Sequence, residues 1–466
     1  MILKNSLKIL NFKFQFLIFF FSFLILTRFN IDPDLGWHLA IGSRFLASGE
    51  IIRLDQFSWT MPGYQWGNPY FAYQILLAFL FNNFSYPTTA IIFGILGSVA
   101  ILILLPRKID LWRFIIVLLA VAITTVNLGV RPHMISFLFF AVLLKLLEKR
   151  FFTGIRQSFF WLIFFAVWAN FHQGFLIGLL ILAAFLLIDF LWQKSSRCRI
   201  LCFSTAIFGT LMTPFNIGLW KTVILDLSGR NTWFSIAEWQ PVIFYFPINL
   251  IYALSAVIFI YLFYGKIRKV EPAWFLITAF LFMMGFLAVN FVSFWALALI
   301  LVISRYWDWQ LNLKGDFWGK LPLAFSLTAV FGAFLLSFLV NLWESKDLRS
   351  RLTANNYPVK AVDYLKANNM TDGLFNEYGW GGYIDWQFPQ AKVFIDGRMT
   401  GWRREGGQYI LSDYMAIVEG KCQAAQKYNI EVLLVKSKTK TACFEDWQHV
   451  YQDQTAKVFV KPGYWQ

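Results

Sequence analysis

Residues 174–192 read GFLIGLLILAAFLLIDFLW and contain a single ionisable residue, Asp189. A helix crosses a bilayer with about 20 mostly apolar residues, and this stretch has that length and composition. Comparable runs recur along the chain, which has 466 residues, is 58% hydrophobic and is only 14% charged. Soluble domains are about 45–50% apolar and about 25% charged. The sequence therefore predicts a polytopic α-helical membrane protein and excludes soluble, disordered and fibrous classes.

The basic residues fall in short loops between the apolar runs. These loops lie near Arg107, Lys149, Lys194, Lys266 and Arg305. Because Lys and Arg concentrate in the cytoplasmic loops of membrane proteins, the net charge of +15 reflects orientation and does not indicate nucleic-acid binding. Lysines also precede the first apolar run, and no small-residue cleavage motif follows it. We therefore expect an uncleaved first span and a cytoplasmic N-terminus.

About eleven spans satisfy this charge pattern in a multi-pass protein of the cell inner (plasma) membrane. Residues 70–84 are apolar but short and carry amide side chains, so we expect an interfacial helix there rather than a span. An odd number of spans places the C-terminus on the exoplasmic side. The expected spans are residues 14–29, 88–105, 112–128, 133–147, 158–170, 174–192, 200–213, 242–264, 272–289, 291–304 and 321–342.

This topology divides the chain into two domains. The first is a transmembrane domain, residues 1–344, which includes a large first exoplasmic loop at residues 30–87. The second is a small exoplasmic α/β domain, residues 345–466, which is long enough to have its own core.

Polar residues gather at the outer ends of the expected spans, whereas the mid-membrane stretches contain almost none. Ionisable residues near hydrocarbon are costly unless they are paired or functional. We predict a shared outward-facing site; the alternative is that these are hydrated loop positions. Its candidate substrate-binding residues are His38, Arg131, His133, Asn170, His172, Arg230 and Glu238. Because Arg131 has no acidic residue in its own turn, we expect it to pair with Asp32 or Asp34 or to bind an anionic ligand.

The first outer loop begins with Asp32 and Asp34, two carboxylates separated by a proline. The proline biases Asp32 away from helix, and Asp34 can cap a helix at residues 35–47. In that helix, Trp37 is expected to anchor at the membrane surface. Carboxylates spaced in this way beside a histidine can hold a divalent metal ion, Mg²⁺ or Mn²⁺, or supply a general base. The alternative is that Asp34 is only an N-cap and Asp32 only a turn residue.

This layout resembles the GT-C superfamily of integral membrane glycosyltransferases, such as protein O-mannosyltransferases and the aminoarabinose transferase of lipid A. The matching stretch is 32–42, followed by a surface helix at 68–84, and the resemblance covers about residues 1–345 as architecture. Segments 130–133 and 170–174 look like motifs of an uncharacterised bacterial branch. The His-Pro-Pro element usual in the mannosyltransferases is absent, and Gly-Asn-Pro-Tyr at 67–70 stands in its place.

The resemblance implies that a sugar moves from a polyprenyl-phosphate donor to an exoplasmic lipid, glycan or protein acceptor. Asp34 would be the catalytic base, and Asp32 would be a metal ligand or the second choice for the base. The residues that would stabilise the departing lipid phosphate are Arg131, His133, His172 and Arg230. Two alternatives are a transporter or flippase for a lipid-linked glycan and a catalytically inactive scaffold for envelope polymers.

From about residue 345 the composition is that of a soluble α/β domain. We expect helices at 358–367, 407–419 and 421–428 and strands at 374–376, 392–395, 431–435 and 456–460. The candidate ligand-binding residues are Trp380, Tyr383, Asp396 and Arg398, and Trp386 and Trp402 are further rings suited to sugar stacking. The alternative is that Asp396 begins a simple turn and that the aromatic residues pack. Cys422 and Cys443 would both face the oxidising side and could form a disulfide.

Overall fold

The computed structural model describes residues 2–106, 108–193, 197–228, 236–266, 270–306 and 332–465. The chain forms two compact units. The membrane unit consists of residues 1–29, 87–212 and 236–343, and the polar unit consists of residues 30–86, 213–235 and 344–466. The first loop, which we had assigned to the transmembrane domain, therefore groups with the C-terminal part of the chain.

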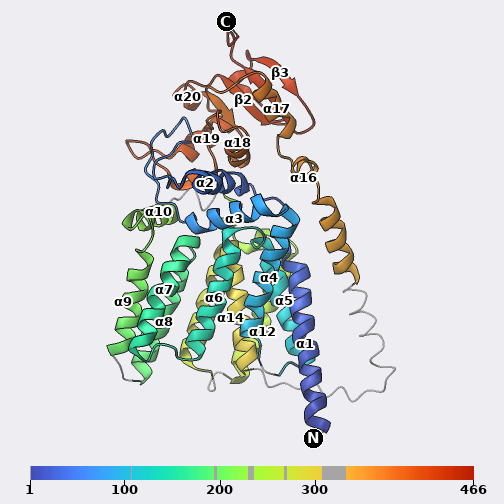
Figure 1. Cartoon of the computed structure of the whole chain (residues 1–466), viewed down its shortest axis with the longest axis vertical. Helices are drawn as coiled ribbons and strands as arrows, with labels where there is room; N and C mark the ends of the chain where they lie inside the picture. The colour runs from blue at the N-terminus through green and yellow to red at the C-terminus, as the bar shows by residue number, and fades with distance from the viewer. Residues whose placement is uncertain are drawn as a thin grey trace. The chain divides into compact units, whose positions relative to one another are not determined.

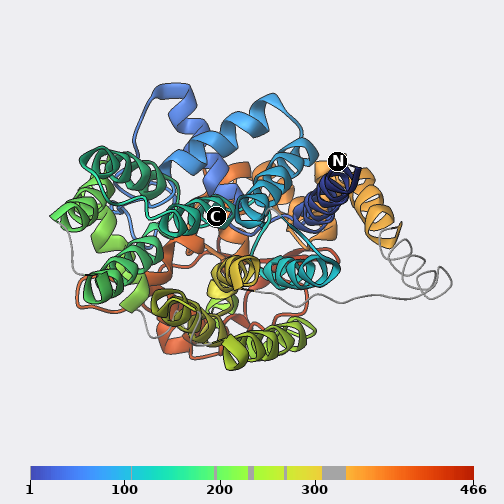
Figure 2. The same ribbon diagram turned by 90° about the horizontal axis from the view of Figure 1, so that it is seen from below.

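The membrane unit is a bundle of helices, labelled in Figure 1 and seen end-on in Figure 2. Its α-helices are α1 (Ile2–Leu26), α4 (Tyr86–Leu104), α5 (Leu111–Ile123), α6 (Pro132–Glu148), α7 (Ile155–Phe171), α8 (Phe175–Gln193), α9 (Arg197–Thr210), α12 (Ile248–Lys266), α13 (Pro272–Leu287) and α14 (Val292–Tyr306). Its 3₁₀ turns are η1 (Thr124–Val126), η2 (Ala237–Trp239), η3 (Val242–Phe244) and η4 (Val289–Phe291). A further apolar helix covers Gly332–Glu344.

Helices coincide with the expected spans of this polytopic membrane protein. By length and composition, three stretches among the described residues can cross a membrane: Tyr86–Leu104, Phe175–Trp192 and Val289–Tyr306. The other helices of the bundle are apolar but shorter, so the count of eleven spans stays a prediction. Of the last expected span, 321–342, residues 321–331 lie outside the described part of the chain.

Helix α14 forms the centre of the bundle. Every residue from Val292 to Ile303 is buried, and α14 packs against α5, α6, α12 and α13. A helix that is apolar on all sides is stable only where other helices cover it. Its largest side chain, Trp295, donates its indole N–H to the Ser255 hydroxyl at 3.0 Å, which satisfies the one polar group that this ring buries.

The polar unit contains helices from three separate parts of the chain. They are α2 (Leu35–Ser48), α3 (Phe71–Asn83), α10 (Ile217–Ser228), α16 (Leu348–Ala354), α17 (Val359–Ala367), α18 (Gly381–Gln387), α19 (Ile410–Val418) and α20 (Cys422–Ala425), with 3₁₀ turns η5 (Tyr378–Trp380), η6 (Gly397–Gly401) and η7 (Ala442–Phe444). Helix α2 ends at Gly49, whose φ of 72° is a left-handed conformation that glycine adopts without strain.

A four-stranded sheet organises the C-terminal part of the polar unit. Its strands are β1 (Leu374–Asn376), β2 (Val432–Lys436), β3 (Gln448–Gln452) and β4 (Ala456–Val460), in the order β1-β2-β4-β3. β1 runs parallel to β2, and the other two pairs are antiparallel. The strands predicted at 374–376, 431–435 and 456–460 are confirmed. β3 was missed because its residues are polar and mostly exposed, which removes the apolar alternation that marks a strand.

The strand predicted at 392–395 is wrong. Its backbone pairs with the first loop instead of the sheet: Val393 N–H donates to the Phe57 carbonyl at 2.9 Å, and Trp59 N–H donates to the Val393 carbonyl at 3.1 Å. The Asn376 side chain accepts from Phe394 N–H at 2.9 Å. These apolar residues are therefore buried by a loop that precedes them by more than 300 positions, which no local pattern could indicate.

Helix α2 packs directly against α18 through glycine. A Cβ atom on Gly36 would lie 2.0 Å from the carbonyl oxygen of Gly382, and a Cβ atom on Gly382 would lie 2.8 Å from a ring carbon of Trp37. Only glycine permits this approach of two backbones. Trp37 is 2% exposed inside the polar unit, so our prediction that it anchors at the membrane surface is wrong.

We expect Gly36→Ala to destabilise the protein, because the added methyl group must push α2 away from α18. Overpacking of this kind costs about 1–3 kcal/mol. Thermal unfolding of the detergent-solubilised full chain would measure the change as a lower melting temperature. Gly379→Ala is the matched control, since a Cβ atom there meets nothing within 4 Å. Equal melting temperatures for the two variants would contradict the contact.

Candidate functional site

The turn that joins Asp32 to Asp34 is built by their own side chains and backbone. The Asp34 N–H donates to the Asp32 carboxylate at 2.8 Å, and the Leu35 N–H donates to the Asp32 carbonyl at 3.0 Å. Asp34 occupies the N-cap position of α2, but its side chain makes no hydrogen bond to the helix backbone. It accepts the indole N–H of Trp37 at 2.9 Å instead. Asp34 therefore precedes α2 without capping it through its side chain, and its carboxylate is bound by the Trp37 indole.

The C-terminal part of the polar unit lies against this turn. A Cβ atom on Gly397 would lie 1.9 Å from Oδ1 of Asp34, so the carboxylate touches the backbone at this position. The Tyr357 hydroxyl donates to the Asp32 carbonyl at 2.7 Å. Asp34 remains partly exposed as a residue, whereas one carboxylate oxygen of Asp32 is buried. The arrangement holds Asp34 in one orientation, as a general base requires, while leaving it reachable.

His38, a predicted substrate-binding residue, is buried between α2 and α3. It is 3% exposed, and its ring contacts those of Tyr70 and Tyr73 at centroid distances of 5.2 Å and 4.9 Å. The Gln74 amide lies 3.4 Å from Nδ1. Burial lowers the pKa of His38 well below its ordinary value, so the ring is neutral at pH 7. These contacts are those of a packed core histidine.

Asp396 and Arg398 form a buried ion-pair cluster with a residue of the first loop. Arg398 donates to Asp396 at 2.5 Å and to Asp55 at 2.9 Å, and all three side chains have no exposed surface. Its guanidinium also lies over the rings of Phe57 and Trp402, at 4.8 Å and 5.3 Å. Such a cluster binds the loop to the C-terminal part of the polar unit and offers no surface to a ligand.

The aromatic candidates of the C-terminal part are also mostly packed. Trp380 and Tyr383 are each 4% exposed, and the Trp380 indole N–H donates to the Asn356 carbonyl at 2.9 Å. Trp402 is 2% exposed, and only Trp386 is partly accessible. The packing alternative therefore describes the first three rings. The sequence does not decide whether Cys422 and Cys443 are bonded, and the structure contains a disulfide between them.

Asp385 lies beside this cluster without a hydrogen-bond donor. Both of its carboxylate oxygens are buried and unbonded among the described residues. Burial, and after it the charge of Asp396, raises the pKa of Asp385 well above its ordinary value of about 4. The folded protein therefore favours the neutral acid at this position.

In the membrane unit, Arg131 pairs with Glu238. Its guanidinium donates to the Glu238 carboxylate, so the acid that we expected from Asp32 or Asp34 comes from η2 instead. Burial by itself raises the pKa of Glu238, but the charges of Arg131 and His133 outweigh it and hold the pKa below its ordinary value. The pair brings two of the predicted site residues together.

Two histidines complete this polar cluster. The rings of His133 and His172 lie 4.4 Å apart, and His172 Nδ1 is 2.7 Å from the Ser136 hydroxyl. The Trp168 indole donates to the same hydroxyl at 2.7 Å. Ser136, which the sequence analysis missed, lies one helical turn after His133 on the same face of α6, and that spacing could have indicated it.

The remaining candidates lie elsewhere. Asn170 donates to the carbonyls of Ala166 and Met212 at 2.8 Å and 3.0 Å, a bridge between helix ends. Arg230 lies outside the described residues. Asp32 and Asp34 belong to the polar unit and the Arg131 cluster belongs to the membrane unit, so the site that we expected them to share stays a prediction.

The metal site proposed at Asp32 and Asp34 would depend on the substrate for further ligands. Within the part of the chain that the structure describes, no group of three or more His, Cys, Asp or Glu residues is placed to hold a metal ion. Mg²⁺ is commonly bound by one or two carboxylates together with substrate phosphates and water. The two carboxylates fit that donor set, and they do not form a complete metal site of protein ligands.

Comparison with known proteins gives the fold. The structure is similar over 91% of its length to an oligosaccharyltransferase from Archaeoglobus fulgidus in its apo form, at 13% identity and a TM-score of 0.52, covering 69% of that chain. It is similar over 97% of its length to arabinofuranosyltransferase AftD from Mycobacteria, at 13% identity and a TM-score of 0.51, covering 40% of that chain. Both are GT-C glycosyltransferases.

This chain has a GT-C-like fold. No protein-family model and no curated protein matches its sequence. The GT-C-like architecture extends beyond the spans, because both similarities cover more than nine-tenths of the chain, including the C-terminal part.

We expect Asp385→Asn to flatten the dependence of stability on pH. Because the folded-state pKa of Asp385 is raised, its contribution to stability is present below about pH 4 and is lost as the pH rises through the folded-state value. Melting temperatures of the wild type should therefore fall between pH 5 and pH 8 more steeply than those of the variant. The exposed Asp372→Asn should behave as the wild type; identical curves for all three proteins would refute the assignment.

We expect Arg131 and Glu238 to be energetically coupled. Melting temperatures of the wild type, Arg131→Gln, Glu238→Gln and the double variant form a double-mutant cycle. The coupling should be about 1–2 kcal/mol, because either single variant leaves a partly buried charge without its partner. Strictly additive effects would show that the pair contributes nothing to folding.

Proposed function

We propose that this GT-C-like chain is a glycosyltransferase that moves a sugar from a polyprenyl-phosphate donor to an exoplasmic lipid, glycan or protein acceptor. The observation that carries the proposal is the position of Asp34. Its carboxylate lies a few residues after α1, is oriented by Trp37 and touches Gly397, yet is partly exposed. The similarity to two glycosyltransferases supports a transferase role in general.

In this proposal Asp34 acts as the general base. Asp34 takes the proton of an acceptor hydroxyl while the acceptor oxygen forms a bond to the anomeric carbon of the donor sugar. The bond between that carbon and the phosphate oxygen breaks, and its electron pair leaves on the lipid phosphate. The Trp37 indole keeps the carboxylate in one orientation, so that the acceptor binds to a preorganised base.

The end of the membrane unit that contains Arg131 would receive the lipid phosphate. Arg131, His133 and His172 gather there, and guanidinium and imidazole N–H groups are suited to phosphate oxygens. A divalent ion, Mg²⁺ or Mn²⁺, would be held by Asp32 and Asp34 and would neutralise phosphate charge. We propose no further cofactor.

We further propose that the chain lies in the inner membrane with the N-terminus in the cytoplasm and the polar unit on the exoplasmic side. The Cys422–Cys443 disulfide supports this orientation, since disulfides persist on the oxidising side of a membrane. Two thiols of the membrane unit, Cys198 and Cys202, are free.

We expect Asp34→Asn to lower transfer by about 10²- to 10⁴-fold, the usual contribution of a general base. An amide oxygen can still accept the Trp37 N–H, so folding should be kept. The assay follows the release of lipid phosphate and the appearance of labelled product from a panel of polyprenyl-phosphate sugars with the full chain in membranes. Chelation by EDTA, followed by addition of Mg²⁺ or Mn²⁺, tests the metal ion in the same assay.

The controls separate catalysis from folding. Asp372→Asn changes an exposed carboxylate of the same unit and should transfer as the wild type does. Melting temperature and the intact disulfide report on the fold of each variant. Near-normal turnover by Asp34→Asn would exclude the base, and a wild-type chain that transfers no sugar from the panel would favour the inactive scaffold or the transporter.

A further inference from the structure

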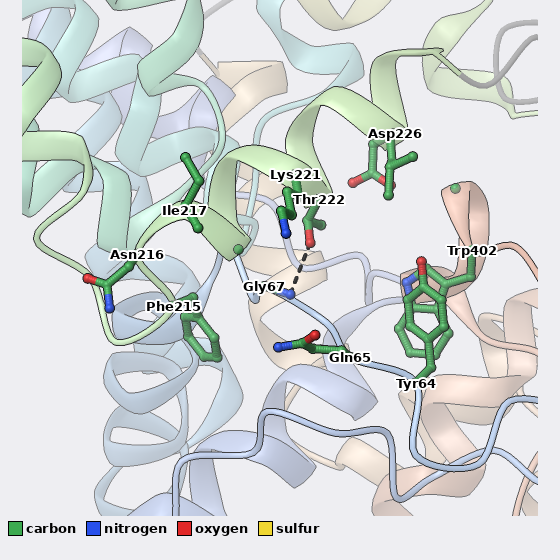
Figure 3. A pocket seen from close by; sticks show the side chains of 13 residues that line it. Tyr64, Gln65, Gly67, Phe215, Asn216, Ile217, Lys221, Thr222, Asp226 and Trp402 are labelled. Carbon is green, nitrogen blue, oxygen red and sulfur yellow. Dashed lines mark hydrogen bonds between the residues drawn. The ribbon is translucent and has the colours of Figure 1, made fainter.

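The polar unit contains a pocket of about 330 Å³ whose lining does not include Asp32 or Asp34 (Figure 3). It is lined by three segments of the unit: residues 64–67, residues 215–226 and residues 401–402. Small-molecule sites in proteins have volumes of about 300–1,000 Å³, so this pocket has the size for one small ligand or for one ring of a larger one.

The walls of the pocket are held by contacts that need no ligand. The rings of Tyr64 and Trp402 stack with their centroids 4.5 Å apart, and the buried guanidinium of Arg398 lies 5.3 Å from the Trp402 ring. The Gly67 N–H donates to the Thr222 hydroxyl at 2.9 Å and so connects the first loop to α10, as Figure 3 shows. The pocket is therefore preformed, which lowers the entropic cost of binding.

Its polar groups suit a neutral ligand with many hydroxyls. Lys221 and Asp226 both project from α10, and within the described part of the chain neither forms an ion pair. The amide of Gln65 adds both a donor and an acceptor. The Asp226 carboxylate would repel an anion, and the Lys221 ammonium would repel a cation. A sugar hydroxyl, in contrast, can accept a hydrogen bond from Lys221 and donate one to Asp226.

The protonation of Asp226 agrees with this chemistry. Burial, opposed by a hydrogen bond from Thr400, raises the pKa of Asp226 to about 7. Near neutral pH its carboxyl group is present in both forms and can either donate to or accept from a hydroxyl. The ring of Tyr64, which is only partly buried, adds the flat apolar surface beside these polar groups.

The pocket is connected to the proposed catalytic base by a single short element. Gly397, at the start of η6, touches Asp34, and a Cβ atom on Gly401, at its end, would lie 2.6 Å from Oδ1 of Asp226. These two ends are four residues apart in the chain. The pocket thus lies beside the reaction centre and is not the reaction centre itself.

We propose that this pocket binds a sugar ring next to the ring that reacts. The proposal rests on the proposed glycosyl transfer and names its substrate class: the acceptor or the donor carries at least two sugar rings. A longer acceptor glycan and a lipid-linked oligosaccharide donor would present the same chemistry to Lys221, Asp226 and Gln65.

Binding can be tested without turnover. The probes are methyl α-D-mannopyranoside, methyl β-D-glucopyranoside and methyl α-D-arabinofuranoside, and the measurement is saturation-transfer NMR on the full chain in nanodiscs. We expect at least one probe to bind the wild type. Lys221→Ala, Asp226→Asn and Gln65→Ala should each weaken that binding by about tenfold, the effect of losing one good hydrogen bond.

Matched controls are exposed residues of the same unit. Lys461→Ala, Asp372→Asn and Gln390→Ala repeat the three changes away from the pocket and should bind as the wild type does. Melting temperatures show that each variant is folded. If no probe binds the wild type, or if the pocket variants bind as well as their controls, the pocket proposal is overturned.

Two further arms distinguish the sources and separate this proposal from the proposed function. A polyprenyl-phosphate disaccharide should displace the bound glycoside if the pocket holds a donor ring, whereas a free disaccharide alone should displace it if the pocket holds an acceptor ring. Asp34→Asn should keep glycoside binding. If the chain has no transferase activity but its pocket variants lose glycoside binding, the proposed function is refuted and the pocket proposal is kept. If the chain transfers sugar but its pocket variants bind glycosides as the wild type does, the pocket proposal is refuted and the proposed function is kept.

Discussion

The buried charge of Arg398 is the constraint on which the polar unit depends. A guanidinium with no exposed surface is stable only when carboxylates surround it, and one of its partners, Asp55, comes from the first loop more than 300 residues earlier. Removing one partner of such a pair typically costs about 3–5 kcal/mol. The loop and the C-terminal part therefore cannot separate without leaving a charge unmatched, and they behave as a single folded unit.

The stretch of chain around Arg398 contacts the first loop, the proposed base Asp34 and the pocket residue Asp226. Val393 pairs with the backbone of the first loop, Gly397 touches Asp34, and Gly401 touches Asp226. The Asp34 carboxylate is thereby held against the backbone of this stretch. Gly401 and Trp402, at the end of this stretch, line the pocket, so the base and the pocket are fixed with respect to each other.

The polar residues of the membrane unit also pair with one another. Arg131 and Glu238 neutralise each other at the ends of apolar helices, where an unmatched charge would be expensive. The rings of His133 and His172 are in contact close to that pair, and His172 is hydrogen-bonded to Ser136. The result is a polar cluster whose N–H donors suit the phosphate of a lipid-linked sugar.

The sequence alone determined the class of the protein, because hydropathy and loop charge act locally: helices coincide with the expected spans within the described residues, and α2 begins after Asp34 close to the expected bounds. It also indicated that Arg131 needs an acid. Tertiary structure alone decided that the acid is Glu238, that Trp37, Asp396 and Arg398 are buried, and that residues 392–395 pair with a loop instead of a sheet. Each of these depends on contacts between residues separated by about one hundred to several hundred positions, and neither propensity nor periodicity carries information about such partners.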